Sequence, residues 1–167
     1  VYKDDCFNFE DGKLLLRGQN GSGKSITTQS FIPFILDGDR SPNRLDPFGS
    51  QDRKMEYYFL LDGQREDATG YLYLEFKKEE SDEYITIGIG QHAHAGRAMT
   101  FWGFVILDGR RIGYDINLYR QSGIVKIPYE KNELKKILGE NTPFTDSSKQ
   151  YKEYVNKYLF GFEESYG

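Results

Sequence analysis

The strongest constraint on the fold of this chain is a glycine-rich segment near its N-terminus. Residues 18–25 read GQNGSGKS, which matches the pattern G-x-x-x-x-G-K-[ST]. The apolar run 14–17 before it is expected to be a buried strand, and the apolar segment from Ile26 onward is expected to be a helix. This order of strand, loop and helix predicts that loop N–H groups and a helix N-terminus surround an anion.

Each residue type in this loop suits the binding of a polyphosphate. Glycines let the backbone curl so that successive N–H groups point inward at the α- and β-phosphates. Lys24 can reach the β- and γ-phosphate oxygens, and the Ser25 hydroxyl is a suitable ligand for Mg²⁺. The predicted phosphate loop consists of Gly18, Gln19, Asn20, Gly21, Ser22, Gly23, Lys24 and Ser25. The alternative is a glycine-rich turn that only caps a helix.

Composition narrows the class of protein. The 167 residues fit a single domain, and the only cysteine, Cys6, cannot form an internal disulfide or a cysteine-based zinc site. The chain is therefore expected in a reducing, cytoplasmic compartment. Its longest uninterrupted apolar run, 57–61, is too short to span a membrane. The net charge of −4 argues against a polyanion-binding surface over the whole domain but leaves a local basic patch open.

The rest of the chain predicts an α/β fold with a mainly antiparallel β arm over about 70–128 and two helices over about 129–160. Strands are expected over 71–77, 84–90, 101–107, 112–119 and 124–127. Asp108-Gly109 between the third and fourth of these predicts a hairpin with a type I′ turn. Helices are expected over 26–36, 52–61, 129–138 and 147–160, with a loop over 39–49. Pro33 should kink or shorten the first helix.

Hydrolysis of a nucleotide also requires a carboxylate that holds Mg²⁺ at the end of a buried strand. Asp108 follows four apolar residues, but Gly109 and a new strand come next, so it is better explained as a turn residue. Asp62 is expected to continue the helix over 52–61. The hydrolytic half of the site is therefore predicted to be absent from this chain.

Two other groups of polar residues have simpler explanations. His92 and His94 would point to one side of an extended chain, as two metal ligands do, but no carboxylate or Cys cluster accompanies them, so a loop at a strand end is favoured. The basic residues near the first helix are interleaved with Asp, so an internally paired, solvated loop is favoured over a DNA contact. These basic residues are Arg40, Arg44, Arg53 and Lys54.

The segment 18–25 resembles the G-x-N-G-x-G-K-S phosphate loop of ABC-type ATPases. The longer run 14–49, LLLRGQNGSGKSITTQSFIPFILDGDRSPNRLDPFG, is similar to the N-terminal head segment of the MukB-like SMC proteins of bacterial Wadjet-type defence systems, and LDPFG at 45–49 is its more family-specific part. The stretches 70–77, 84–90, 101–113 and 151–162 resemble the same family.

The resemblance implies that residues 1–167 are an excised N-terminal half-head with the P-loop NTPase fold. In that family the signature motif and the acidic magnesium strand lie in a C-terminal half beyond a long coiled coil, and hydrolysis needs two heads that enclose ATP. The implied partners are thus the C-terminal half-head, a second head in a homodimer, DNA and accessory subunits of a condensin-like complex at the nucleoid. Lys24 and Ser25 would contact the γ-phosphate and Mg²⁺, with Lys24 the catalytic contact.

The resemblance further implies that Ile26 and Thr27 contact the α-phosphate and that Asn20 faces the partner head. The family's Q-loop glutamine is not assigned, because Gln91 ends an apolar strand but lies on the expected antiparallel arm. Two alternatives to an SMC-like motor stay open. One is a stand-alone small P-loop NTPase or kinase that uses Asp108 as its metal carboxylate, and the other is a nucleotide-sensing interaction module that does not hydrolyse.

Overall fold

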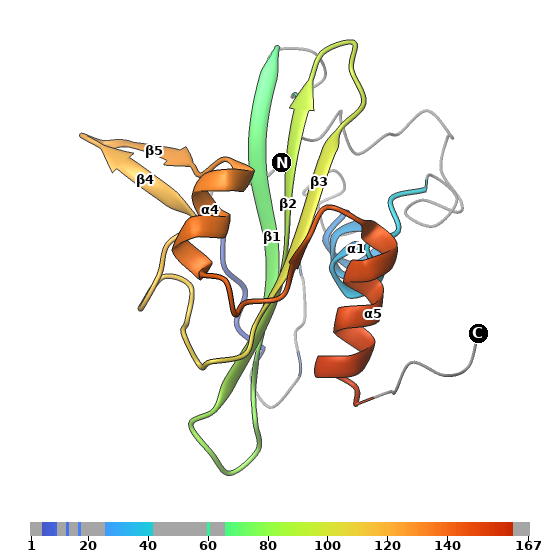
Figure 1. The fold of residues 1–167 in the computed structure, drawn as a ribbon, viewed down its shortest axis with the longest axis vertical. Helices are drawn as coiled ribbons and strands as arrows, with labels where there is room; N and C mark the ends of the chain where they lie inside the picture. Colours follow the sequence, from blue (N-terminus) through green and yellow to red (C-terminus); the bar gives the residue numbers. More distant parts are fainter. Residues whose placement is uncertain are drawn as a thin grey trace.

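A four-stranded antiparallel sheet in the order β1-β2-β3-β6 is the centre of the fold (Figure 1). The computed structural model describes residues 5–9, 13, 17, 26–41, 60 and 66–161. The strands of the sheet are β1 (Asp67–Lys77), β2 (Tyr84–His94), β3 (Thr100–Ile106) and β6 (Phe144–Thr145). The described part of the chain is therefore mixed α/β, with an antiparallel central sheet.

Helices lie on both faces of this sheet. A π-helical segment (Ile26–Phe31) leads into α1 (Ile32–Asp37), which packs with α5 (Ser148–Tyr158) on one face. Helix α4 (Lys131–Leu138) lies on the other face, beside a separate hairpin of β4 (Tyr119–Ser122) and β5 (Val125–Pro128) (Figure 1). The sheet thus separates two hydrophobic cores.

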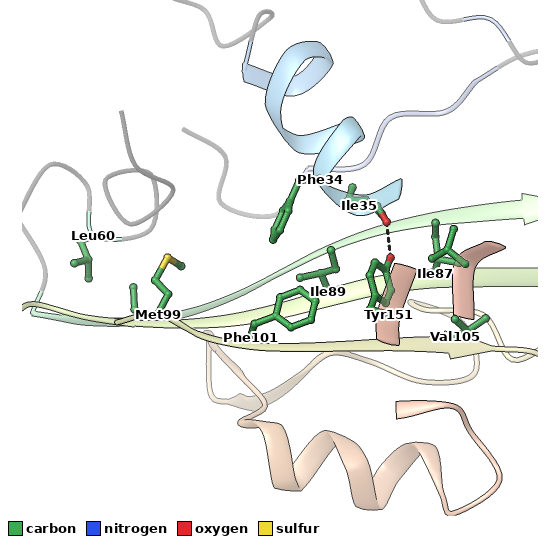
Figure 2. Close-up of a cluster of buried hydrophobic side chains, with 11 residues drawn as sticks. Phe34, Ile35, Leu60, Ile87, Ile89, Met99, Phe101, Val105 and Tyr151 are labelled. Carbon is green, nitrogen blue, oxygen red and sulfur yellow. Dashed lines mark hydrogen bonds between the residues drawn. The ribbon is translucent and has the colours of Figure 1, made fainter. Parts of the chain in front are cut away.

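The core under α1 and α5 is built from alternate residues of β2 and β3. Ile87 and Ile89 on β2 belong to one buried cluster with Phe34 of α1 and the aromatic side chains of Phe101 and Tyr151 (Figure 2). The Phe101 ring meets the rings of Phe34 and Tyr151 edge-on, at centroid distances of 6.2 and 6.0 Å. The period of two along each strand places these side chains on one face.

The opposite core depends on glycines in β2. Gly88 and Gly90 pair with Phe104 and Trp102 of β3, and the two aromatic rings lie over the glycine backbone. A Cβ atom at Gly88 would be 2.3 Å from the Phe104 ring, and one at Gly90 would be 2.1 Å from the Trp102 ring. Only glycine leaves room for these rings, because real Cβ atoms do not approach so closely.

Most of the predicted elements are confirmed, with shifted ends. Strands expected over 71–77, 84–90 and 101–107 correspond to β1, β2 and β3, and β1 and β2 are each longer by four residues. The strand expected over 124–127 is β5, and the two C-terminal helices are α4 and α5. Helix α4 begins at a Glu130–Glu133 capping box, and α5 begins at Ser147, whose side chain accepts from the Gln150 amide.

One predicted element is wrong. Residues 112–119 do not form a strand that pairs with β3, and Asp108-Gly109 does not form a hairpin turn, although Gly109 has the positive φ of 83° that such a turn requires. Local bonds close the chain over 111–116 instead, because the Asp115 carboxylate accepts from the Arg111 amide at 2.8 Å. The Arg111 carbonyl in turn accepts from the amides of residues 114–116. The short strand β6 takes the place beside β3.

Three further expectations lie outside the described residues. They are the strand over 14–17 apart from Arg17, the loop over 42–49, and the helix over 52–61 apart from Leu60. The predicted single-domain organisation of residues 1–167 stays a prediction.

The requirement for glycine at position 88, where the Phe104 ring packs on the backbone, can be tested by substitution. Gly88→Ala should lower the free energy of unfolding by about 2–3 kcal/mol, because the new methyl group overlaps the ring and forces a backbone or rotamer shift. Chemical denaturation followed by tryptophan fluorescence measures the change. The double variant Gly88→Ala/Phe104→Leu should lose less than the sum of the single changes, because leucine is shorter. A Gly88→Ala protein within about 0.5 kcal/mol of the original would contradict this account.

Candidate functional site

The predicted phosphate loop, residues 18–25, lies outside the described part of the chain, and so do the side chains of Ile26 and Thr27. The structure does describe the helical segment that starts at Ile26, directly after Ser25 of the motif. It runs as a π-helix to Phe31 and continues as α1, in which Pro33 stands in the first turn. The predicted effect of Pro33 is confirmed in this form, since regular α-helix is confined to Ile32–Asp37.

The C-terminal end of α1 is fixed by two hydrogen bonds. Gly38 adopts a left-handed conformation with φ of 70°, and its amide donates to the Phe34 carbonyl at 2.8 Å. The Tyr151 hydroxyl of α5 donates to the Ile35 carbonyl at 2.5 Å (Figure 2). Burial raises the pKa of Tyr151 well above its ordinary value, so the hydroxyl keeps its proton and remains a donor at neutral pH.

Short-range bonds occupy the polar residues that follow α1. The Asp37 carboxylate accepts from the Asp39 amide, and the Asp39 carboxylate accepts from the Ser41 amide, both at 2.9 Å. Arg40 donates to the Met99 carbonyl at 3.0 Å, at the start of β3. The Asp carboxylates of residues 37–41 therefore bond to the local backbone, and Arg40 bonds to a residue outside the loop. Arg44, Arg53 and Lys54 lie outside the described residues, so the internally paired loop stays a prediction for them.

Gln91 lies in the middle of the sheet rather than in a loop. It is 1% exposed, pairs with Gly70 of β1 and Phe101 of β3, and shares its face with Ile87 and Ile89. Within the described part of the structure neither its amide nitrogen nor its amide oxygen has a hydrogen-bond partner. A buried amide without hydrogen-bond partners lowers the free energy of unfolding, and the packing around Gln91 does not explain why a polar residue stands there.

His92 and His94 belong to β2, so the favoured interpretation of a loop at a strand end is wrong. The His92 ring joins two strands and the first turn of α4. Its Nε2 lies 2.8 Å from Asp67 and its Nδ1 lies 2.7 Å from the Thr69 hydroxyl, which donates to Glu130 at 2.7 Å. No group of three or more His, Cys, Asp or Glu in the described ranges could hold a metal ion.

The sequence offered no signal for this His92 cluster. Asp67, Thr69 and Glu130 are ordinary surface residue types, and they meet His92 only because β1 pairs with β2 in this register and α4 begins at that edge. These contacts have a structural role, because Glu130 is also the N-cap residue of α4 and the cluster connects the start of this helix to β1 and β2.

The Asp108 carboxylate is bound by Arg110. The Arg110 Nε lies 2.8 Å from one oxygen and the Arg110 amide 3.1 Å from the other, and this side-chain bond lowers the pKa of Asp108. The Arg110 guanidinium also donates to the Ile137 and Leu138 carbonyls at the end of α4. Asp108 therefore positions an arginine that fixes a helix end, and this geometry gives no support to a role as metal carboxylate.

The chain was compared with protein-family models, curated proteins and solved structures. No match was found in any of the three comparisons. Among the helices that the structure describes, none is long and apolar enough to cross a membrane.

The Tyr151 hydroxyl can be removed without changing the ring. Tyr151→Phe should destabilise the protein by about 1–3 kcal/mol, because the Ile35 carbonyl stays buried without its donor. Urea denaturation measures the change. The control is Tyr154→Phe, on the same helix but partly exposed, which should change stability by less than about 0.5 kcal/mol. Equal effects of the two substitutions would show that the hydrogen bond from the Tyr151 hydroxyl to the Ile35 carbonyl does not stabilise the protein.

The ion pair of Asp108 should make stability depend on acid pH. Because the folded-state pKa is lowered, the carboxylate stabilises the protein above the ordinary Asp pKa of about 3.9, and this contribution is lost as the pH falls through the folded-state pKa. Asp108→Asn should therefore lower the melting temperature at pH 7 and have little effect near pH 3. The highly exposed Asp82 provides the control Asp82→Asn. A deficit of the same size at both pH values would refute the prediction.

Proposed function

We propose that this chain is the ATP-binding N-terminal half of an SMC-like motor ATPase that acts on chromosomal or plasmid DNA. The observation that carries the proposal is the motif at 18–25, whose last residue directly precedes the helix that begins at Ile26. A phosphate loop needs this continuity, because the first turn of the following helix supplies free N–H groups and the positive end of the helix dipole. Lys24 and Ser25 would bind the γ-phosphate and Mg²⁺.

The support of that helix agrees with the proposal. Phe34 and Ile35 are buried against the sheet, and Gly38 and Tyr151 fix the end of α1. A helix held in this way gives the preceding loop a rigid base, which electrostatic binding of a triphosphate requires.

The chain is proposed to hydrolyse ATP only together with its C-terminal half and a second head. The candidate for a magnesium carboxylate within this chain, Asp108, has both oxygens bound by Arg110. Water activation and the second metal contact would thus come from the other half of the head. The role of such a motor in plasmid defence, with DNA and condensin-like accessory subunits as partners, rests on the resemblance of 14–49 to the Wadjet-associated family.

Nucleotide binding tests the phosphate loop. The purified chain should bind Mg-ATP weakly in calorimetry, and Lys24→Ala should lower the affinity at least about tenfold, because the charged contact to the phosphates is lost. Lys152→Ala, an exposed lysine on α5, serves as the control and should bind like the original chain. Equal affinity of the Lys24→Ala protein, or no binding by the unmodified chain at millimolar ATP, would contradict the proposal.

Turnover separates the motor half from the two alternatives. The isolated chain should release negligible phosphate from ATP, and the C-terminal half of the head should restore hydrolysis when added. Robust hydrolysis by the chain alone, abolished by Asp108→Asn, would instead support a stand-alone P-loop enzyme. Binding without turnover even with the C-terminal half present would support a nucleotide-sensing module.

A further inference from the structure

The directions of the hydrogen bonds in the His92 cluster determine the protonation state of its ring. The Thr69 hydroxyl carries a single proton and donates it to the Glu130 carboxylate at 2.7 Å. The His92 Nδ1 lies 2.7 Å from the same hydroxyl oxygen, so the ring is the donor in that contact. On its other side Nε2 lies 2.8 Å from the Asp67 carboxylate, and an ionised carboxylate can only accept. Both ring nitrogens are therefore assigned a proton, and the ring is an imidazolium.

The carboxylates around the ring favour the same assignment. Asp67 faces it from β1, and Glu130 faces it from the N-cap position of α4, with its second oxygen 3.5 Å from Nδ1. The nearest titratable side chain on the same face of β2 is His94, which pairs in register with Asp67. A positive charge on His92 is attracted to both carboxylates, whereas a neutral ring leaves their charges uncompensated.

The basic side chains near the start of α4 have other partners. Lys131 lies 3.3 Å from Asp146, and Arg120 lies 2.8 Å from Glu133. No Lys or Arg side chain among the described residues forms an ion pair with the two carboxylates of the His92 cluster. Within this part of the structure the imidazolium is thus the group that compensates their charge.

Loss of one ring proton breaks this chain of hydrogen bonds. A neutral imidazole has one N–H group and one lone pair. If Nδ1 keeps the proton, the lone pair of Nε2 faces the Asp67 carboxylate at 2.8 Å, which is repulsive. If Nε2 keeps the proton, its bond to Asp67 remains, and the Thr69 hydroxyl turns its proton to Nδ1 and away from Glu130. The second arrangement is favoured, because a bond to a charged acceptor is the stronger one, and it disconnects Glu130 from the sheet.

We propose that the His92 cluster is a pH-sensitive switch, which holds the start of α4 against the sheet when the ring is charged and releases it when the ring is neutral. The release reaches the core beneath α4, because the Tyr71 hydroxyl bonds to the Tyr129 carbonyl, directly before Glu130. The Tyr71 ring meets the Trp102 ring edge-on at 5.8 Å. Trp102 is the only tryptophan of the chain and is 1% exposed, so it reports a change in this packing. The switch requires no nucleotide and is independent of the proposed function.

Acrylamide quenching of Trp102 fluorescence at two pH values tests the switch. At about pH 5.5 an imidazole with the ordinary pKa of about 6.5 is mostly charged, and at about pH 8 it is mostly neutral, whereas carboxylates with ordinary pKa values of about 4 are ionised at both. The original chain should therefore show a larger quenching constant at the higher pH. His92→Gln and Thr69→Val should show the larger constant at both pH values, because each breaks the connection to Glu130 permanently.

Thermal denaturation provides a second measurement. The charged ring makes the bonds, so their contribution is present below the ordinary imidazole pKa and is lost above it. His92→Gln should lower the melting temperature by about 2–4 °C at about pH 5.5 and by less than about 1 °C at about pH 8. The control is His94→Gln, two residues further along the same strand face, which should keep the pH dependence of the original chain in both measurements.

Equal quenching of the original chain at both pH values would overturn the proposal. Loss of the pH dependence in His94→Gln would also overturn it, because His94 would then be the titrating group. A Thr69→Val protein that keeps the full pH dependence would show that the connection to Glu130 does not carry the effect, and this result would overturn the proposal even if His92→Gln failed to fold. Circular dichroism checks the folding of each variant. No measurement uses ATP, so failure here is distinct from failure of the proposed function.

Discussion

The contact on which the described structure most depends is made by one side chain, Tyr151. Its ring lies against Gly103, where an added Cβ would be 2.4 Å from the ring, and its hydroxyl binds the Ile35 carbonyl. This residue therefore connects α5 and β3 to the helix that follows the predicted phosphate loop. The C-terminal helix α5 thus supports the helix that follows the predicted phosphate loop, through a hydrogen bond between residues 116 positions apart in the sequence.

Polar contacts on the other face of the sheet have a similar structural purpose. Arg110 occupies the last carbonyls of α4, and the His92 cluster meets its first turn, so both ends of this helix are bound to side chains from the sheet or its loops. Tyr71 adds a bond to the Tyr129 carbonyl just before α4, and burial raises its pKa. Arg110, the His92 cluster and Tyr71 therefore all help to position α4.

Periodicity predicted much of the fold, because the relevant signals are local. Alternation of Ile85, Ile87 and Ile89 identified β2, and the apolar stripe behind the Ser147 cap identified α5. The prediction of a hairpin at Asp108-Gly109 was wrong because the Asp115 carboxylate accepts from the Arg111 amide and closes a different loop. Strand β6 could not be found at all, since its two residues depend entirely on pairing with β3.

The candidate site divides in the same way. The predicted phosphate loop is a continuous pattern in the sequence, whereas Tyr151 and the His92 cluster make their contacts with residues that are distant along the chain. Asp108 combines the two situations, because its sequence pattern is local but its contacts depend on distant residues. Its position after an apolar strand imitates a metal carboxylate, and only the placement of Arg110 and α4 explains its contacts.

The alternation of isoleucine and glycine along β2 also bears on how the chain reaches its native pairing. A shift of the register against β3 by one residue would place Ile87 and Ile89 on the face where the Phe104 and Trp102 rings pack. Gly88 and Gly90 would then lie on the face toward α1. One side would then be overfilled and the other would contain voids. A sheet with shifted register is consequently disfavoured by steric overlap on one face and by voids on the other, so the sequence of β2 specifies its register against β3.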